Sequence, residues 1–311
     1  MSLTVSISTG SAADTSTLPM PASIDCRFDF SGSKPLEEGI SRPIEAFPDH
    51  DVFRPPLADL KQPRFFATYQ EVQVRTPTPQ ANLGSSVRVG SVGFGESFGL
   101  VGQRNGCDGW QVGILAGVFA QFNLDSPSQD LINADYVIGI PFSWRSGLVS
   151  TRVRFYHQSS HLGDEFLLGN PGIKRVGVSF EEFEALLSFD MPGGWGRVYA
   201  GGGYLVHAEP QLDPVKIQWG LELRGPTYHT PLYGALLPDL RIIPVLGADF
   251  KAFEELNWGV NTNAVTGLEF YRGTGSRRFR VLVNYYYGYN PYGQFFQQKI
   301  ETVGIGACLE F

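Results

Sequence analysis

The C-terminal segment places the strongest limit on what this 311-residue chain can fold into. Lys299 to Phe311 read KIETVGIGACLEF, and from Val303 onward every second residue is apolar, ending on an aromatic side chain. This period of two is typical of a β-strand with one apolar face and one small or polar face. Bacterial outer-membrane barrels end in such a strand, with the apolar face toward lipid. The segment therefore favours a membrane barrel.

The composition leaves two fold classes open and closes others. A hydrophobic content of 42% suits a soluble all-β protein, and it also suits a barrel in which half of each strand is polar. The sequence has no run of about 20 apolar residues, which excludes a helical membrane protein. The 37 glycines and 23 phenylalanines favour the barrel, because it needs small residues inside and aromatic girdles outside. A net charge of -7 argues against nucleic acid as a partner.

Strand-like periodicity recurs along the chain after residue 62. Trp110 to Phe122 and Phe279 to Tyr289 alternate over their whole length. Twelve such segments can be counted, and single-chain bacterial barrels have an even number of strands. We therefore predict an all-β fold, a twelve-stranded antiparallel transmembrane β-barrel formed by residues 63–311. The predicted strands are 64–74, 86–100, 109–122, 131–142, 147–159, 173–190, 195–207, 214–224, 241–252, 256–271, 277–289 and 298–311.

The region before the strands has no sustained period. Residues 1–62 are rich in Pro, Ser and Asp, and we predict an extended or partly disordered arm in the periplasm. Within it, Asp59 is expected to cap a short helix or to contact the floor of the barrel. With both termini in the periplasm of a bacterial outer membrane, odd-numbered strands run outward. The long link 225–240 then falls on the periplasmic side, where links are usually short. It is either an insertion, or one strand has been miscounted there.

Charged residues occupy inward positions on many of these strands. A narrow twelve-stranded interior lined by ion pairs is either plugged or crossed by a thin channel, and both alternatives stay open. The inward charged residues are Asp135, Arg152, Arg154, Glu182, Glu184, Asp190, Arg197, Arg278 and Arg280.

One strand carries residues suited to catalysis. His157 and Ser159 continue the outward face of the predicted strand 147–159, near its outer end. Two residues on one face of a strand lie roughly 7 Å apart at Cα, within reach of a Ser–His hydrogen bond. A serine activated by a base is the usual nucleophile for acyl transfer. A hairpin centred near residue 170 places Glu181 opposite Ser159 and Phe183 opposite His157, so Glu181 is the candidate that orients His157.

The segment His157–Ser160, HQSS, resembles the H-x-S-N segment of outer-membrane phospholipase A and of the lipid A deacylases. The resemblance implies that His157 is the base and Ser159 the nucleophile, acting on outer-membrane lipids from the outer wall of a barrel. Phospholipase A likewise has twelve strands. The segment departs from that pattern at Ser160, where those families favour Asn. We expect a serine acyl hydrolase of outer-leaflet lipid; the alternative is a non-catalytic barrel, either a narrow pore or a structural protein.

A second resemblance covers more of the chain. The segments 53–65 (FRPPLADLKQPRF), 157–166 (HQSSHLGDEF) and 288–296 (GYNPYGQFF) resemble a bacterial outer-membrane family known only as a domain of unknown function. This likeness implies the barrel and its compartment, and it implies no activity.

Three further expectations concern metal, cysteine and assembly. His161, Asp164 and Glu165 could bind Ca²⁺, which prefers oxygen ligands, or they form a solvated acidic loop. Cys26 and Cys107 both fall on the periplasmic side, where a disulfide would tie the arm to the barrel. A homodimer is one candidate assembly.

Overall fold

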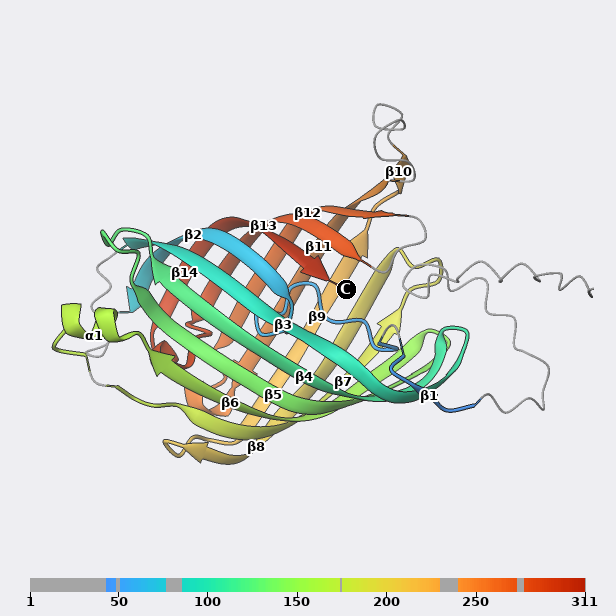
Figure 1. The fold of residues 1–311 in the computed structure, drawn as a ribbon, viewed down its shortest axis with the longest axis horizontal. Coiled ribbons are helices and arrows are strands. Elements are labelled where there is room, and N and C mark those ends of the chain that lie inside the picture. Colours follow the sequence, from blue (N-terminus) through green and yellow to red (C-terminus); the bar gives the residue numbers. More distant parts are fainter. Residues whose placement is uncertain are drawn as a thin grey trace, which may run out of the picture.

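The computed structural model describes residues 43–48, 51–76, 86–173, 175–229, 240–272 and 277–310. Its strands form one fourteen-stranded sheet, in which β1 (Glu45–Ala46) and β10 (Tyr228–His229) are two-residue additions. The other twelve strands slant around a single closed barrel (Figure 1). They are β2 (Phe65–Thr76), β3 (Ser86–Asn105), β4 (Asp108–Asn123), β5 (Leu131–Ser146), β6 (Val149–Leu162), β7 (Ser179–Asp190), β8 (Gly196–Glu209), β9 (Val215–Arg224), β11 (Leu240–Phe253), β12 (Val260–Arg272), β13 (Arg278–Tyr289) and β14 (Lys299–Glu310).

The pairing of the first and last barrel strands closes the sheet. β14 pairs with β2 over almost its whole length, and β3 pairs with both β2 and β4. The predicted twelve-stranded antiparallel barrel is confirmed, and each predicted strand overlaps an observed one. The largest difference in boundaries lies at β7, which begins at Ser179 rather than at residue 173 because residues 175–178 have no regular structure.

Among the described strands, none lies between β9 and β11 in the wall of the barrel, although a long link joins them. β9 pairs directly with β11, with Arg224 opposite Val245. The short β10 pairs with β11 beyond the end of β9 and extends that edge by two residues. The link is therefore an insertion, of which residues 230–239 lie outside the described part of the chain.

The two faces of the wall differ as the alternation predicts. On β5 the outward residues are large and apolar, whereas Asp135 and Arg145 on its inner face are buried. On β14, Val303 and Ile305 are 54% and 53% exposed on the outer surface. All nine charged residues expected inside are buried. Among the described residues, no helix has the length and apolar character needed to cross a membrane.

The two ends of the barrel have different links. At one end the β3–β4 and β5–β6 turns have two residues each, and Gly147, with φ of 57°, lies in the β5–β6 turn, where left-handed backbone favours glycine. At the other end the β6–β7 link contains helix α1 (Asp164–Gly169), and two 3-10 turns, η2 (Glu254–Leu256) and η3 (Gly293–Phe295), join neighbouring strands. Figure 1 places α1 and β1 at opposite ends of the barrel.

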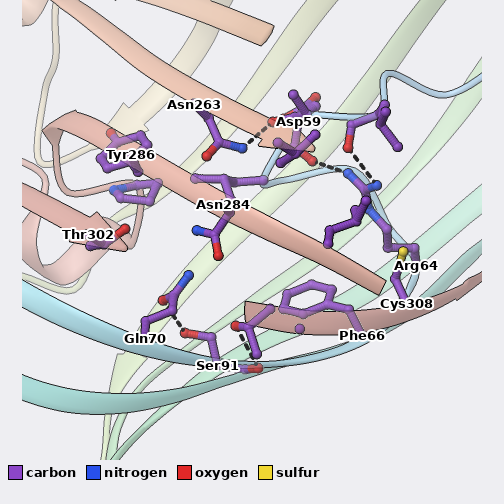
Figure 2. Close-up of a pocket in the computed structure, with 18 of the residues that line it drawn as sticks. Asp59, Arg64, Phe66, Gln70, Ser91, Asn263, Asn284, Tyr286, Thr302 and Cys308 are labelled. Carbon is purple, nitrogen blue, oxygen red and sulfur yellow. Dashed lines mark hydrogen bonds between the residues drawn. The ribbon is translucent and has the colours of Figure 1, made fainter. Parts of the chain in front are cut away.

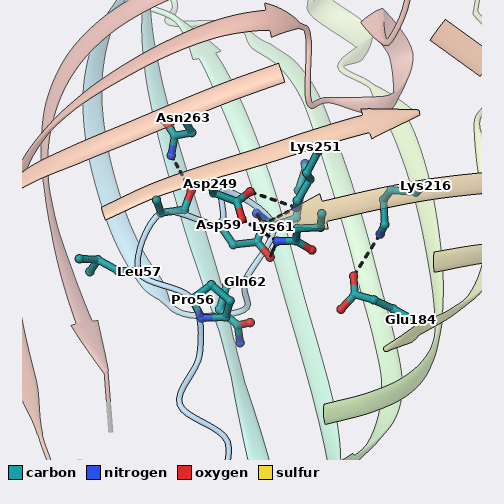
Figure 3. Close-up of polar contacts among 12 residues, drawn as sticks. Pro56, Leu57, Asp59, Lys61, Gln62, Glu184, Lys216, Asp249, Lys251 and Asn263 are labelled. Carbon is teal, nitrogen blue, oxygen red and sulfur yellow. Dashed lines mark hydrogen bonds and ion pairs between the residues drawn. The ribbon is translucent and has the colours of Figure 1, made fainter. Parts of the chain in front are cut away.

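Residues 51–64, called here the luminal segment, lie inside the barrel. The sequence predicted an extended periplasmic arm up to residue 62; its last part instead fills the lumen, with Phe53 and Asp59 fully buried. The cause is the charged inner wall, which supplies partners for a segment with no periodicity of its own. Asp59 Oδ1 accepts a 2.5 Å hydrogen bond from Lys251 on β11, and Lys61 lies beside it (Figure 3).

Bonds to both backbone and side chains hold the luminal segment on several sides. Strands β5, β6, β7, β8, β9 and β12 all contribute a partner. These contacts include Leu57 N to Glu222 Oε1 at 2.7 Å, Asn263 Nδ2 to Ala58 O at 2.6 Å, Arg145 Nε to Val52 O at 2.8 Å, Arg152 Nη1 to Gln62 Oε1 at 2.8 Å, Arg54 with Asp190 at 3.0 Å, and Arg197 with Arg54 O.

The luminal segment also reaches the link between β13 and β14. The Lys61 ammonium lies 2.5 Å from Asp135 Oδ2 and 3.9 Å from the centre of the Tyr292 ring. From the same link, Gln294 Nε2 donates to Ser160 O on β6 at 3.2 Å. The three segments that resemble the uncharacterised family therefore meet at one end of the lumen.

Two cavities flank the luminal segment. One of about 90 Å³ lies between the segment and the inner faces of β2, β13 and β14, and it is lined by Gln70, Asn284, Thr302 and Cys308 among others (Figure 2). The other, of about 160 Å³, lies toward the end that carries α1. Protein atoms therefore occupy the lumen at the level of the luminal segment, which favours the plugged alternative over a channel.

The two cysteines in the described part of the chain, Cys107 and Cys308, differ in their bonding. Cys107, in the turn between β3 and β4, is buried and takes part in a disulfide. Cys26 lies outside the described residues, so its pairing with Cys107 stays a prediction. Cys308 is free and buried.

Candidate active site

His157 and Glu181 form a bonded pair on the outer wall. His157 Nδ1 lies 2.7 Å from Glu181 Oε1, and the two side chains are 40% and 31% exposed. A carboxylate only accepts hydrogen bonds, so Nδ1 of the neutral ring is the protonated nitrogen. The other ring nitrogen, Nε2, is then left as an acceptor. This is the arrangement that a general base needs.

The register between β6 and β7 differs from the predicted one by two residues. Glu181 lies opposite His157, and Ser179 lies opposite Ser159. The prediction placed a hairpin centre near residue 170, but the link contains a helix and an irregular stretch, and the strands pair about a centre one residue earlier. The shift moves Glu181 from beside Ser159 to beside the residue that it was expected to orient.

Ser159 shares the outward face of β6 with His157. It is half-buried, with Tyr136 of β5 and Ser179 of β7 as its neighbours across the sheet. Within the described residues no hydrogen bond joins Ser159 to His157. Catalytic contacts in a free enzyme are often long and tighten when the substrate binds. The strand geometry thus places a hydroxyl and an imidazole on one face without locking them together.

A second histidine, which the sequence pattern missed, contacts the same carboxylate. His207 Nδ1 of β8 lies 3.1 Å from Glu181 Oε2, and its side chain is 64% exposed. Alternation along β8 from Val198 predicts that residue 207 points into the lumen. A bulge in the β7–β8 pairing reverses this, because Glu181 pairs with His207 whereas Glu182 pairs with Leu205. We call His157, Ser159, Glu181 and His207 the outer-wall cluster.

The outer-wall cluster lies where the apolar surface of the barrel gives way to polar residues. Next to it along the strands come Phe155 and Phe183, whose rings are 5.0 Å apart and exposed. Ser179 lies beside Ser159, and His161 comes beyond the cluster toward α1. Ionisable groups on a lipid-facing wall are costly and usually functional, so a carboxylate between two imidazoles at this boundary is a strong candidate site.

A family described as "Protein of unknown function (DUF1207)" matches residues 7–311. The chain belongs to this family. The predicted likeness to an uncharacterised outer-membrane family is thereby confirmed, and membership brings no activity with it. No curated protein matches the chain.

Several solved structures resemble the barrel at low sequence identity. Outer membrane phospholipase A from Escherichia coli is 15% identical, with a TM-score of 0.49 over 80% of this chain and 90% of that chain. LpxR from Salmonella typhimurium is 9% identical, with a TM-score of 0.39 over 79% and 99% of the two chains. The KdgM porin in complex with oligogalacturonate is 9% identical, with a TM-score of 0.38 over 78% and 97%. The case for an activity rests on the side chains of this chain.

The residues expected to bind a metal do not gather into a site. His161 packs edge-on against the Tyr136 ring, with 5.6 Å between the ring centres. Asp164 is 92% exposed at the start of α1 and lies 3.7 Å from Arg175. Among the described residues, no three or more His, Cys, Asp or Glu side chains form a group that could hold a metal ion. Glu165 therefore belongs to no such group.

Proposed function

We propose that this protein is a serine-dependent acyl hydrolase that acts on outer-leaflet lipids. The observation that carries the proposal is the 2.7 Å contact of His157 Nδ1 with Glu181 on the outer wall, on the face that also carries Ser159. The contact fixes the protonated nitrogen of the base and leaves Nε2 to accept the serine proton. A base held by a carboxylate and placed near a serine is the arrangement of serine hydrolases.

The chemistry proceeds in two stages. Ser159 Oγ attacks the ester carbonyl while His157 takes its proton; the bond to the alcohol then breaks, and the alcohol receives that proton. Water next attacks the acyl-serine with His157 as base, which releases the carboxylic acid and restores Ser159. Glu181 stays ionised and stabilises the imidazolium form of His157 in both stages.

The place of the cluster suits a lipid substrate. An ester at the boundary between acyl chains and headgroups would lie level with the edge of the apolar surface, beside Phe155 and Phe183. The proposal puts the end with α1 outside the cell and both termini in the periplasm. An epitope tag in residues 169–172 should then be detected on whole cells, and a tag in residues 192–194 should not; the reverse result would overturn this orientation.

The luminal segment bears on the rival function. A pore needs a continuous aqueous path, and residues 51–64 fill the lumen with buried ion pairs to several strands. The outer-wall cluster, in contrast, has no evident use in a pore or in a structural barrel. The hydrolase proposal therefore accounts for a group of residues that the rival leaves unexplained.

The test is lipid hydrolysis by the full chain in detergent and in vesicles. Phospholipid and lipopolysaccharide are supplied separately, each with Ca²⁺ and with a chelator, so that the substrate class and any role of His161, Asp164 and Glu165 are measured together. Wild type should release fatty acid from one of the two lipids, and Ser159→Ala should not. Heat-modifiable mobility on gels checks that the variant barrel is folded. Full activity of Ser159→Ala on both lipids, or inactivity of the wild type, would overturn the proposal.

A further inference from the structure

A β-bulge on β8 delivers His207 to the outer-wall cluster. Val206 has no partner in the β7–β8 register, so Val206 and His207, consecutive residues, both lie exposed on the outer surface. Without the bulge, the alternation of β8 would turn the imidazole into the lumen. Bulges next to active sites commonly redirect a side chain in this way.

The two oxygens of Glu181 have different imidazole partners. Oε1 contacts His157 at 2.7 Å, and Oε2 contacts His207 at 3.1 Å. Since the carboxylate only accepts, each neutral ring donates through Nδ1. A glutamate held on one side only keeps much of its rotational freedom, and a half-exposed pair of this kind is weak on its own. A second donor from the neighbouring strand fixes the plane of the carboxylate.

We propose that His207 is a positioning residue, which holds Glu181 so that Glu181 in turn holds the His157 ring. This inference rests on the proposed hydrolase function. His207 is separated from Ser159 by β7, because Ser159 lies on β6 and His207 on β8. It acts through the carboxylate and does not take the serine proton itself.

Kinetics of three variants in the full chain test this role. His207→Ala should lower kcat about fivefold and leave KM unchanged, because the substrate contacts are intact and only the alignment of the base suffers. His207→Asn, which keeps an N–H donor at a similar distance from the backbone, should restore most of the loss. Glu209→Gln, on the same exposed face of β8, is the matched control and should match the wild type.

Two kinetic results would overturn the role of His207. An unchanged kcat in His207→Ala would show that Glu181 needs no second donor. A loss as large as that of His157→Ala, with no rescue by asparagine, would show that His207 is itself the base.

A measurement that needs no hydrolysis separates this inference from the proposed function. The chain has five histidines, so ¹⁵N-histidine labelling gives few ring signals, which single substitutions can assign. At a pH where the rings are neutral, His157 and His207 should both be protonated at Nδ1, and both should lose that preference in Glu181→Ala, while His161 should not change. A His207 ring that ignores Glu181→Ala would overturn the inference. Inactivity of the wild type toward lipid would overturn the proposed function and leave this result readable.

Discussion

The barrel carries two groups of ionisable residues that differ in how deeply they are buried. In the lumen, Asp59 is fully buried, is bonded to Lys251 at 2.5 Å, and belongs to a segment that several strands hold. On the outer wall, Glu181 is 31% exposed and has two histidines as its partners. The luminal residues are surrounded by protein, whereas the outer-wall residues are partly exposed on the outside of the barrel.

This difference in burial separates residues that stabilise the barrel from residues that are available for catalysis. Removing one charge from the lumen leaves its partner buried without compensation, which is costly. Removing a charge from a half-exposed pair costs little stability, because water or headgroups can replace the partner. Substitutions in the lumen should therefore change stability, and substitutions on the outer wall should change activity.

The largest effect should come from the nucleophile. Ser159→Ala should lower kcat for lipid hydrolysis by at least about a thousandfold, because it removes the hydroxyl that attacks the ester. Its unfolding midpoint in detergent should equal that of the wild type. The proposed difference between the luminal and outer-wall residues is wrong if this variant stays active, or if it loses activity only because it no longer folds.

The next largest effect should be on stability. Asp59→Ala leaves Lys251, which is 16% exposed, without its main partner and should lower the free energy of unfolding by about 3 kcal/mol. Guanidinium unfolding followed by tryptophan fluorescence measures this change. The double variant Asp59→Ala with Lys251→Met removes both charges and should recover about half of the loss. Equal stabilities of Asp59→Ala and the wild type would show that the luminal segment is not held as the contacts indicate.

A smaller effect on rate should follow at the orienting residue. Glu181→Gln should lower kcat by about tenfold to a hundredfold, because the amide still contacts the His157 ring but no longer stabilises its positive form. Its unfolding midpoint should stay close to that of the wild type. A variant that unfolds as readily as Asp59→Ala would place Glu181 among the structural residues, and the luminal and outer-wall residues would then not differ in role.

The smallest effect should come from an exposed ion pair at the rim. Arg88 Nε lies 2.5 Å from Asp125 Oδ1, with 59% and 37% of the side chains exposed. Arg88→Ala should shift neither the unfolding midpoint nor the rate of lipid hydrolysis, since solvent screens the pair. It serves as the control for Asp59→Ala, and a shift of similar size in both would mean that burial does not explain the difference.

Alternation was sufficient to predict the barrel, and it failed where the backbone departs from alternation. All twelve strands and the inward positions of residues such as Arg197 followed from a period of two. His207 was missed because one bulge residue, Val206, reverses the faces beyond it. The register at Glu181 was off by two because the β6–β7 link is not a tight hairpin.

The luminal segment could not be predicted from local pattern. It has no periodicity, and its contacts join residues far apart in the chain: Asp59 and Lys251 are 192 residues apart. The charged inner wall showed that partners were needed but not where they would come from. The sequence predicted that His157 and Glu181 both lie on the outer face and that Glu181 orients His157. It did not predict that they are directly opposite each other, which follows from the observed register.

Covalent labelling of the nucleophile tests the proposed hydrolase function most directly. Full-length protein in detergent is treated with a fluorophosphonate probe, which reacts with serines activated by a base, and the modified residue is located by mass spectrometry. The proposed hydrolase function predicts a label on Ser159 that is lost in His157→Ala and weakened in Glu181→Gln, while Asp59→Ala, where folded, is labelled like the wild type. No label on Ser159 in the folded wild-type barrel, or a label that persists unchanged in His157→Ala, would contradict it.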